Sequence, residues 1–396
     1  MASPPTSNDP TSAAMSSMAE LDARGSEDRA QTAERGTTTR DTTASLSIAR
    51  WLFVCAFFVA AMVAVGGYTR LSHAGLSITE WKPVTGALPP LSHEAWLGEY
   101  AKYRASPEFQ QLHHWMSLED FKGIYWIEWS HRLLGRVTGL VVFVPLLYWV
   151  ARGALRGRRL AAVLGVFALG GLQGFLGWFM VASGLVRRPS VSHFRLTAHL
   201  LLALAIFVAL VSMGLRIADE AAKSDRVALP KVRSLAFASL VSAFVTITWG
   251  GLVAGLKAGL VCDTFPLMHG SVIPPNLFAL SPAAANLVNN GLTVQFVHRT
   301  LAYTTAGIVI ATVIKAMRTP EASASVRRAA WLLLAAVGLQ ITLGALTVLT
   351  HVHLHTALTH QCNALFVISS ALLLAHRASP VVAAQGTSAG AVRRSV

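Results

Sequence analysis

Eight apolar stretches, each about 20 residues long, constrain the fold of this chain more than any other feature of its sequence. A helix of about 20 apolar residues crosses the ~30 Å hydrocarbon core of a bilayer. Only 13% of the 396 residues are charged, about half of the ~25% that is usual in soluble domains. The sequence therefore predicts an all-α polytopic membrane protein. The eight predicted spans cover roughly residues 50–68, 129–150, 160–182, 196–215, 232–253, 292–314, 329–349 and 356–376.

The basic residues gather in every second loop. Thirteen lysines and arginines fall in the segments 151–159, 216–233 and 315–328, whereas the loop after the fifth span holds only Lys257. Loops on the cytoplasmic side are enriched in Lys and Arg, so this asymmetry explains the net charge of +14 without nucleic acid as a partner. The pattern predicts that both termini face the cytoplasm.

The N-terminal segment, residues 1–47, is rich in Ser, Thr and Ala and predicts a disordered cytoplasmic tail. It carries five acidic residues between positions 20 and 34. Mitochondrial transit peptides are poor in acids, and no cleavable signal is evident. We therefore expect the first span to act as the insertion signal, in the inner membrane of a bacterium.

The two halves of the chain match in register. An offset of 167 residues aligns the second and third spans of one half with those of the other, and the first and fourth spans align at nearby offsets. Each half has four spans, an even number, so both halves insert the same way, as in other parallel repeats. The matched residues are His131-Arg132-Leu133-Leu134 with His298-Arg299-Thr300-Leu301, Gln173 with Gln340, Gly177 with Gly344, Gly66-Gly67 with Gly250-Gly251, and His199 with His360.

This duplication predicts two tandem, pseudo-symmetric four-helix bundles. The first covers residues 48–216 and the second residues 232–377. A cytoplasmic linker, 217–231, joins them, and a cytoplasmic tail, 378–396, follows the second.

Four histidines lie inside the predicted spans: His131, His199, His298 and His360. An ionisable residue within a span is costly, and its default interpretation is functional. Each lies about one turn inside the start of an even-numbered span, and these spans all run inward from the outer face. The four side chains therefore share nearly one depth, with two in each bundle, where facing helices build cofactor sites. Two imidazoles on opposite helices suit the two axial positions of a haem iron, so we predict one bis-histidine haem per half.

Other metal sites fit the sequence less well. Zinc prefers three or four protein ligands, and two histidines per bundle do not supply them. The run His351, His353 and His355 lacks a counterpart in the first half and is interpreted as a solvated turn. For any one histidine taken alone, a hydrogen-bonded core residue is the simpler interpretation, and only the set of four favours haem.

The three cysteines predict neither a disulfide framework nor covalent haem. Cys55 and Cys362 fall within spans, and only Cys262 falls in an outer loop. No Cys-x-x-Cys-His motif is present, so a bound haem is expected to be non-covalent.

The two halves differ in the residue that lies three positions before the histidine of their second span. Glu128 precedes His131 by three residues and shares its helix face, whereas the matching residue of the second half is Gln295. A carboxylate there can orient a histidine, shuttle protons or stabilise a developing cation. The alternative is an i,i+4 ion pair with Arg132. The longest outer loop, 69–127, lies on the same half and carries Trp81, Trp96 and Trp115, which we expect at the membrane interface.

Four arginines stand at the outer ends of the spans, near where haem propionates would point. Arginine pairs with carboxylates through two donors at once, which is the physical reason to expect such contacts. Snorkelling at helix ends explains the same positions. These arginines are Arg70, Arg132, Arg195 and Arg299.

Several of these residues lie in segments that resemble the haem A synthase family, in the branch shared by alphaproteobacteria and mitochondria. The resemblance runs from about residue 48 to 376. It is carried by Gly66-Gly67-Tyr68-Thr69-Arg70-Leu71, Glu119-Asp120-Phe121-Lys122-Gly123-Ile124-Tyr125, Glu128-Trp129-Ser130-His131-Arg132, Gln173-Gly174-Phe175-Leu176-Gly177-Trp178, Arg195-Leu196-Thr197-Ala198-His199, Gln295-Phe296-Val297-His298-Arg299 and Thr359-His360-Gln361. The family's other branch has a cysteine pair in its outer loops. Here only Cys262 is present, so no disulfide mechanism is carried over.

The resemblance implies an enzyme that oxidises the C8 methyl of haem O to the formyl group of haem A, by two successive hydroxylations and loss of water. It places substrate haem between His131 and His199, with Glu128 as the catalytic acid, and haem b between His298 and His360. It also implies haem O synthase as the source of substrate and cytochrome oxidase assembly factors as partners.

Two functions of other classes stay open at this point. A b-type cytochrome would bind two haems and only transfer electrons. A histidine-lined transporter would favour a polar path through the whole membrane, whereas the inner halves of these spans are apolar. The electron donor, the oxygen source and a homo-oligomeric state are not determined by the sequence.

Overall fold

Eight long apolar helices form the protein, as the sequence predicted. The computed structural model describes residues 42–82, 85–185, 189–222 and 226–380. Each helix is long and apolar enough to cross a membrane, so the chain is a multi-pass membrane protein. The helices are the first helix (Thr42–Leu71), α4 (Leu118–Ala151), α5 (Gly157–Gly184), α6 (His193–Ala222), α7 (Pro230–Gly255), α9 (Gly291–Met317), α10 (Ala324–Leu349) and α11 (Leu354–Arg377).

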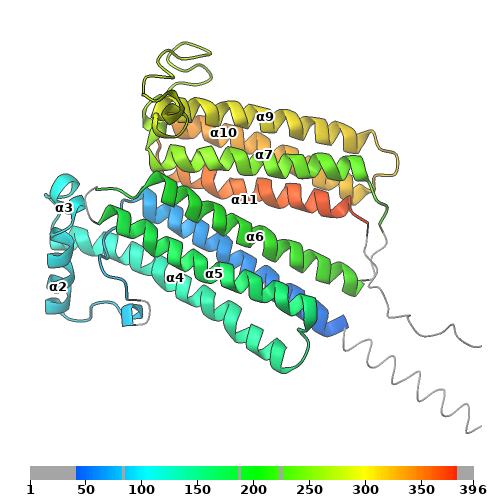
Figure 1. Ribbon diagram of the computed structural model, residues 1–396, viewed down its shortest axis with the longest axis horizontal. Helices are drawn as coiled ribbons and strands as arrows, with labels where there is room; N and C mark the ends of the chain where they lie inside the picture. Colours follow the sequence, from blue (N-terminus) through cyan, green and yellow to red (C-terminus); the bar gives the residue numbers. More distant parts are fainter. Residues whose placement is uncertain (1–41, 83–84, 186–188, 223–225, 381–396) are drawn as a thin grey trace, which may run out of the picture.

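The helices gather in two groups of four (Figure 1). The first helix lies with α4, α5 and α6, and α7 lies with α9, α10 and α11. Helix α6 packs on both α7 and α11, and the first helix also contacts the second group, because Gln361 of α11 donates to the Val63 carbonyl (2.8 Å). The division of the chain into two bundles with the predicted bounds stays a prediction. Their relation by pseudo-symmetry stays a prediction.

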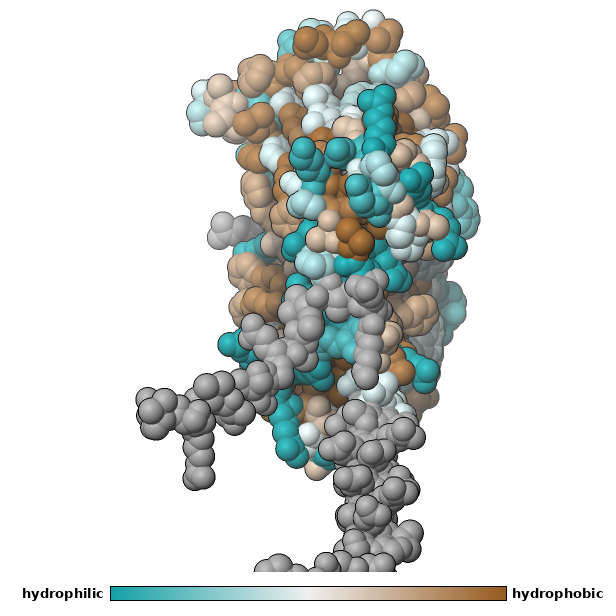
Figure 2. Space-filling model, turned by 90° about the vertical axis from the view of Figure 1, so that its right-hand side faces the viewer, coloured by the Kyte–Doolittle hydropathy of each residue, from teal (hydrophilic) through white to brown (hydrophobic). Residues whose placement is uncertain are grey.

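Both ends of the described chain lie at one end of the bundle. The first helix begins and α11 ends there, opposite the end that carries α2 and α3 (Figure 1). Figure 2 looks onto that end and shows hydrophilic side chains gathered across it, with hydrophobic side chains around them. The first helix begins inside the segment 1–47 that was assigned to the tail, because helix already starts at Thr42. Residues 1–41 and 381–396 of the two predicted tails lie outside the described residues.

Short elements occupy the opposite end. Figure 1 shows α2 and α3 beyond the first group of long helices, with α4 extending toward them. The elements are η1 (Thr85–Ala87), α2 (His93–Arg104) and α3 (Pro107–Leu112) in the first half, and η2 (Ala258–Leu260), η3 (Ala283–Ala285) and α8 (Asn286–Asn289) in the second.

Helix α4 begins earlier than the apolar pattern predicted, so His131 lies farther from the start of its helix than expected. Ser117 and Asp120 form a capping box, in which the Asp120 N–H donates to Ser117 Oγ (3.2 Å) and the Ser117 N–H to Asp120 Oδ2 (3.0 Å). The helix therefore starts at Leu118, and His131 lies about 20 Å along it rather than one turn inside it. The first turns of α4 are polar, so hydropathy alone predicted that the helix begins later in the chain than it does.

A buried ionic cluster joins the two groups at the end where Thr42 and Arg377 lie. Asp219 of α6 forms an ion pair with Arg226, and its Oδ2 lies 2.5 Å from Nε2 of His376 on α11. Arg226 also donates to the His376 carbonyl (3.0 Å), and the Leu229 N–H donates to the Ala378 carbonyl (3.0 Å). The linker between the halves is thus held at its C-terminal end by α11.

Candidate functional site

The second-half histidines face each other across the bundle. The ring centroids of His298 on α9 and His360 on α11 are 6.5 Å apart, and the ring planes are 81° apart. Metal–imidazole bonds of about 2.0–2.1 Å on both sides of one ion would place the centroids about 6 Å apart. The separation of the two rings leaves room for an iron between them, and the bis-histidine haem stays a prediction.

Both second-half rings have one nitrogen fixed by a backbone carbonyl. His298 Nδ1 lies 3.0 Å from the Thr246 oxygen, and His360 Nδ1 lies 3.1 Å from the Gln340 oxygen. A carbonyl only accepts hydrogen bonds, so each Nδ1 carries the proton and each Nε2 keeps its lone pair. Such an anchor fixes the orientation of a metal-binding histidine and raises its basicity.

A buried amide pair supports His360. Gln340 of α10 donates from Nε2 to the His360 carbonyl (3.0 Å), and its Oε1 accepts from Asn363 Nδ2 (2.7 Å). Asn363 also donates to the Ala336 carbonyl (2.9 Å). Sequence reasoning overlooked Asn363, although a polar residue three positions after a span histidine shares its helix face. The matching residue of the first half is Leu202, so this support exists in the second half alone.

The first-half histidines lack comparable anchors. His199 of α6 has His131 of α4 as an electrostatic neighbour. Gln173 of α5 donates to the His199 carbonyl (3.0 Å), and its Nε2 lies 3.2 Å from His199 Nε2. His199 Nδ1 is buried without a hydrogen-bond partner. Gln340 Nε2 likewise lies 3.4 Å from His360 Nε2, so His199 and His360 differ in the carbonyl at Nδ1, which the matching sequence motifs did not predict.

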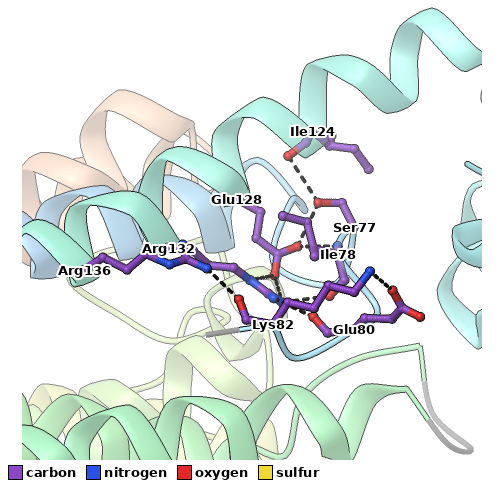
Figure 3. A network of polar contacts seen from close by, with 8 residues as sticks. All are labelled: Ser77, Ile78, Glu80, Lys82, Ile124, Glu128, Arg132 and Arg136. Atoms are coloured by element: carbon purple, nitrogen blue, oxygen red, sulfur yellow. Dashed lines mark hydrogen bonds and ion pairs between the residues drawn. The ribbon is translucent and has the colours of Figure 1, made fainter. Parts of the chain in front are cut away.

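Glu128, three residues before His131 in α4, is buried in a network of polar contacts (Figure 3). Its side chain is 3% exposed. Oε2 accepts from Ser77 Oγ and from the Ile78 N–H, both at 2.8 Å. Oε1 accepts from Arg132 Nε (3.1 Å) and Nη2 (2.7 Å). The i,i+4 ion pair considered from the sequence is therefore present, and it shares the carboxylate with the outer loop.

Arg132 extends this network along the outer loop. It donates from Nη2 to the Ile78 carbonyl (2.7 Å) and from Nη1 to the Glu80 carbonyl (2.9 Å), and Arg136 donates to the Lys82 carbonyl (2.9 Å), as Figure 3 shows. Hydrogen bonds from Lys102 and Lys82 lower the pKa of Glu80 to about 2. One helix face of α4 thus holds the loop that follows the first helix.

The second half holds its own outer loop through the matching positions. Gln295 donates to the Cys262 carbonyl (2.9 Å), and Arg299 donates to the Thr264 carbonyl (2.8 Å). Gln295 Oε1 is buried without a hydrogen-bond partner. Glu128 therefore accepts hydrogen bonds from its loop, whereas Gln295 donates one to its loop. Of these two matching positions, only the one in the first half carries a carboxylate.

The other two predicted arginines contact backbone carbonyls. Arg70 donates to the Ala254 carbonyl (3.4 Å), which joins the first helix to α7. Arg195 donates to the Phe179 carbonyl (2.6 Å), and its guanidinium lies 3.5 Å from the centroid of the Phe179 ring. Arg132 and Arg299 also bind carbonyls, as described above. Contacts from these arginines to propionates stay a prediction.

The outer segment of the first half packs an aromatic core against α4. Trp96, Tyr103, Phe121 and Tyr125 are buried there, whereas Trp81 and Trp115 are 51% and 66% exposed. Glu108 is buried in the same segment, and burial raises its pKa to about 7. This layer covers the end of α4 that carries Glu128.

Neither Cys262 nor the histidine run adds a metal site. Burial raises the pKa of Cys262, but hydrogen bonds involving Thr264 outweigh it, so the net pKa is lowered. His351, His353 and His355 are exposed, and His351 Nδ1 lies 3.7 Å from Asp263 Oδ2. Within residues 42–380, the three short gaps apart, no group of three or more His, Cys, Asp or Glu side chains is placed to hold a metal ion.

Comparison with known proteins places this site in a family. The model of the family described as "Cytochrome oxidase assembly protein" matches residues 49–372. A protein named "Heme A synthase" from Rhodospirillum centenum is 45% identical over 341 residues, which are 86% of this chain and 91% of that protein. Proteins of the same name from Azorhizobium caulinodans and a Bradyrhizobium species are each 46% identical, covering 82% and 86% of this chain and 91% and 93% of their own lengths. The chain, with its eight spans and its paired intramembrane histidines, belongs to the haem A synthase family.

Proposed function

We propose that this protein is a haem A synthase, an oxidoreductase that converts the C8 methyl of haem O into a formyl group by successive hydroxylations, giving haem A for cytochrome oxidase. Identity of about 45% to proteins named "Heme A synthase", over most of both chains, is the observation that carries the proposal. The close approach of His298 and His360, whose ring centroids are 6.5 Å apart, supports it independently.

The second half is proposed to hold haem b. His298 and His360 would bind its iron through Nε2, because carbonyls occupy both Nδ1 atoms. Haem b, when bound, supplies a one-electron relay. Anchored ligands of this kind favour a permanently bound cofactor, since their orientation is fixed before binding.

The first half is proposed to bind substrate haem between His131 and His199. A substrate has to enter and leave, and the unanchored Nδ1 of His199 suits an exchangeable site. Glu128 lies three residues before His131, and its charge is oriented by Arg132 and the loop. Its carboxylate would accept protons released as the methyl group is oxidised and would stabilise developing positive charge.

The cellular setting follows from the same family and from the charge pattern. We propose a bacterial inner membrane location with both termini in the cytoplasm, on the side of the Lys- and Arg-rich loops. Haem O synthase is the proposed supplier of substrate, and cytochrome oxidase assembly factors are the proposed recipients of product.

Haem analysis of the purified protein tests the proposal. The protein is expressed with a supply of haem O, and its haem is extracted and separated by chromatography. We expect haem A together with haem b. Haem b alone, in membranes that contain haem O, would instead support the alternative of a b-type cytochrome that only transfers electrons.

The amide pair beside His360 gives a second prediction. Asn363→Leu introduces the residue of the first half and removes the hydrogen bond to Gln340 Oε1. We expect an altered midpoint potential of haem b and about 10-fold or more weaker retention of it, the range known for groups that orient a metal ligand. Redox titration and haem stoichiometry measure this. Leu202→Asn serves as the matched control, which should leave haem b unchanged. An unaltered potential in Asn363→Leu would show that Asn363 does not act on His360.

A further inference from the structure

We infer that four glycines, Gly66, Gly177, Gly250 and Gly344, are positioning residues, each giving room to the imidazole of one candidate haem ligand. The role toward haem rests on the proposed function, whereas the contact between glycine and ring does not. Two of the five sequence matches between the halves pair these glycines, and nothing in the function proposed above uses them.

The same relation occurs at all four positions. A Cβ added to Gly66 would lie 3.1 Å from His131 Nε2, and one added to Gly177 would lie 3.1 Å from His199 Cε1. At Gly250 and Gly344 the Cβ would lie 3.0 Å from Cε1 of His298 and of His360, respectively. Non-bonded carbon atoms prefer about 3.5–4.0 Å, so any side chain at these positions would press on the ring.

General helix packing does not account for this set. Small residues are common where membrane helices approach closely, and a Cβ there meets whatever lies opposite. At Gly251 it would meet Thr197, and at Gly214 it would meet Phe53. At the four positions above, the nearest atoms all belong to an imidazole. Gly destabilises a helix relative to Ala, so the space for the ring is a physical reason to keep it.

The two halves use the glycines differently. His298 and His360 are held on one side by the carbonyls of Thr246 and Gln340 and meet a glycine on another. A methyl group at Gly344 would therefore push a ring that cannot turn without losing its hydrogen bond. His199 has no anchor at Nδ1, so its ring can yield to a methyl group at Gly177. We expect Gly344→Ala to disturb the protein more than Gly177→Ala.

A double-mutant cycle in the haem-free full-length protein tests the contact itself. Gly344→Ala should lower the midpoint temperature of unfolding, whereas Gly338→Ala, on the same helix with open space around its Cβ, should not. In the His360→Ala background, Gly344→Ala should cause no further loss, because the ring it presses on is gone. An equal loss in both backgrounds, or an equal loss from Gly338→Ala, would overturn the inference.

Spectroscopy of the haem-loaded protein tests the positioning role. We expect Gly344→Ala to change the low-spin signature and midpoint potential of haem b, or to lower its retention about 10-fold or more. Gly338→Ala should match the unmodified protein. In the first half, Gly177→Ala is compared with Gly174→Ala, three residues earlier, where a Cβ has open space.

The two experiments separate the two possible failures. Coupling between Gly344 and His360 without any change in haem b would overturn the positioning role and, with it, the proposed haem site at His360. If haem b is bound and Gly344→Ala changes neither its spectrum nor the midpoint temperature of unfolding, only the glycine inference is overturned. If Gly344→Ala does not accumulate, Gly177→Ala with its control carries the same test.

Discussion

Glu128→Gln is expected to stop haem A formation while both haem sites still fill. A positioned acid or base contributes about 10²–10⁴ in rate, so we expect a loss of at least about 100-fold. The amide keeps the shape of the side chain but not its charge, and it copies the residue of the second half, Gln295. Haem A is measured by extraction and chromatography, and haem occupancy by the pyridine haemochrome spectrum.

The loop contacts of Glu128 require a control, because loss of the carboxylate also weakens the hold on the outer loop. Ser77→Ala removes one hydrogen bond to Oε2 and leaves both the charge and the pair with Arg132. We expect Ser77→Ala to keep most of the activity. If Ser77→Ala reduced haem A as strongly as Glu128→Gln, a structural role for the loop would explain both. A normal rate in Glu128→Gln would rule out Glu128 as the catalytic acid.

Breaking the pair with Arg132 also has a cost in stability. Removing one partner of a buried ion pair costs about 3–5 kcal/mol when the other charge is left without partners. Arg132 retains the carbonyls of Ile78 and Glu80, so we expect Glu128→Gln to cost less than that. The variant should therefore still be purified in folded form.

His360→Ala is expected to remove haem b from the second half and to leave the first half able to bind haem. The paired geometry explains the size of this effect, because a single remaining imidazole cannot supply both axial ligands of a low-spin iron. The haem content should fall by about one per chain, or the remaining haem should become high-spin, as optical and EPR spectra report.

Two further variants make this prediction specific. His355→Ala, in the exposed run before α11, should leave the haem content unchanged. His199→Ala should affect only the haem of the first half. Retention of a low-spin haem b in His360→Ala at full occupancy would contradict its assignment as a ligand.

Much of the architecture could be predicted from the sequence, because a bilayer allows few alternatives. Every backbone polar group must be satisfied within the membrane, so an apolar stretch of sufficient length becomes a helix. The eight predicted spans all lie within observed helices. The ends of the helices were less predictable. The capping box at Ser117 is a short polar signal, and hydropathy does not register it.

The site was predictable in its residue types but not in its contacts. The sequence alone shows four histidines in matching spans and a carboxylate in only one half. That Glu128 shares its charge between Arg132 and the backbone of Ile78 depends on a loop about 50 residues away in the chain. The support that Asn363 gives to Gln340 likewise depends on how α10 and α11 pack.

The sequence by itself thus determined the eight spans, the matching of the halves and the identity of the paired histidines, because hydropathy and register are properties of the chain. Only the tertiary structure decided which ring nitrogens are anchored, which carbonyls hold them and which glycines face them. These depend on helix packing at the scale of a single methyl group, and two halves with the same motif can differ there. The eight apolar stretches fix what kind of molecule this is, and the packing between them decides which histidine nitrogens lie against a backbone carbonyl.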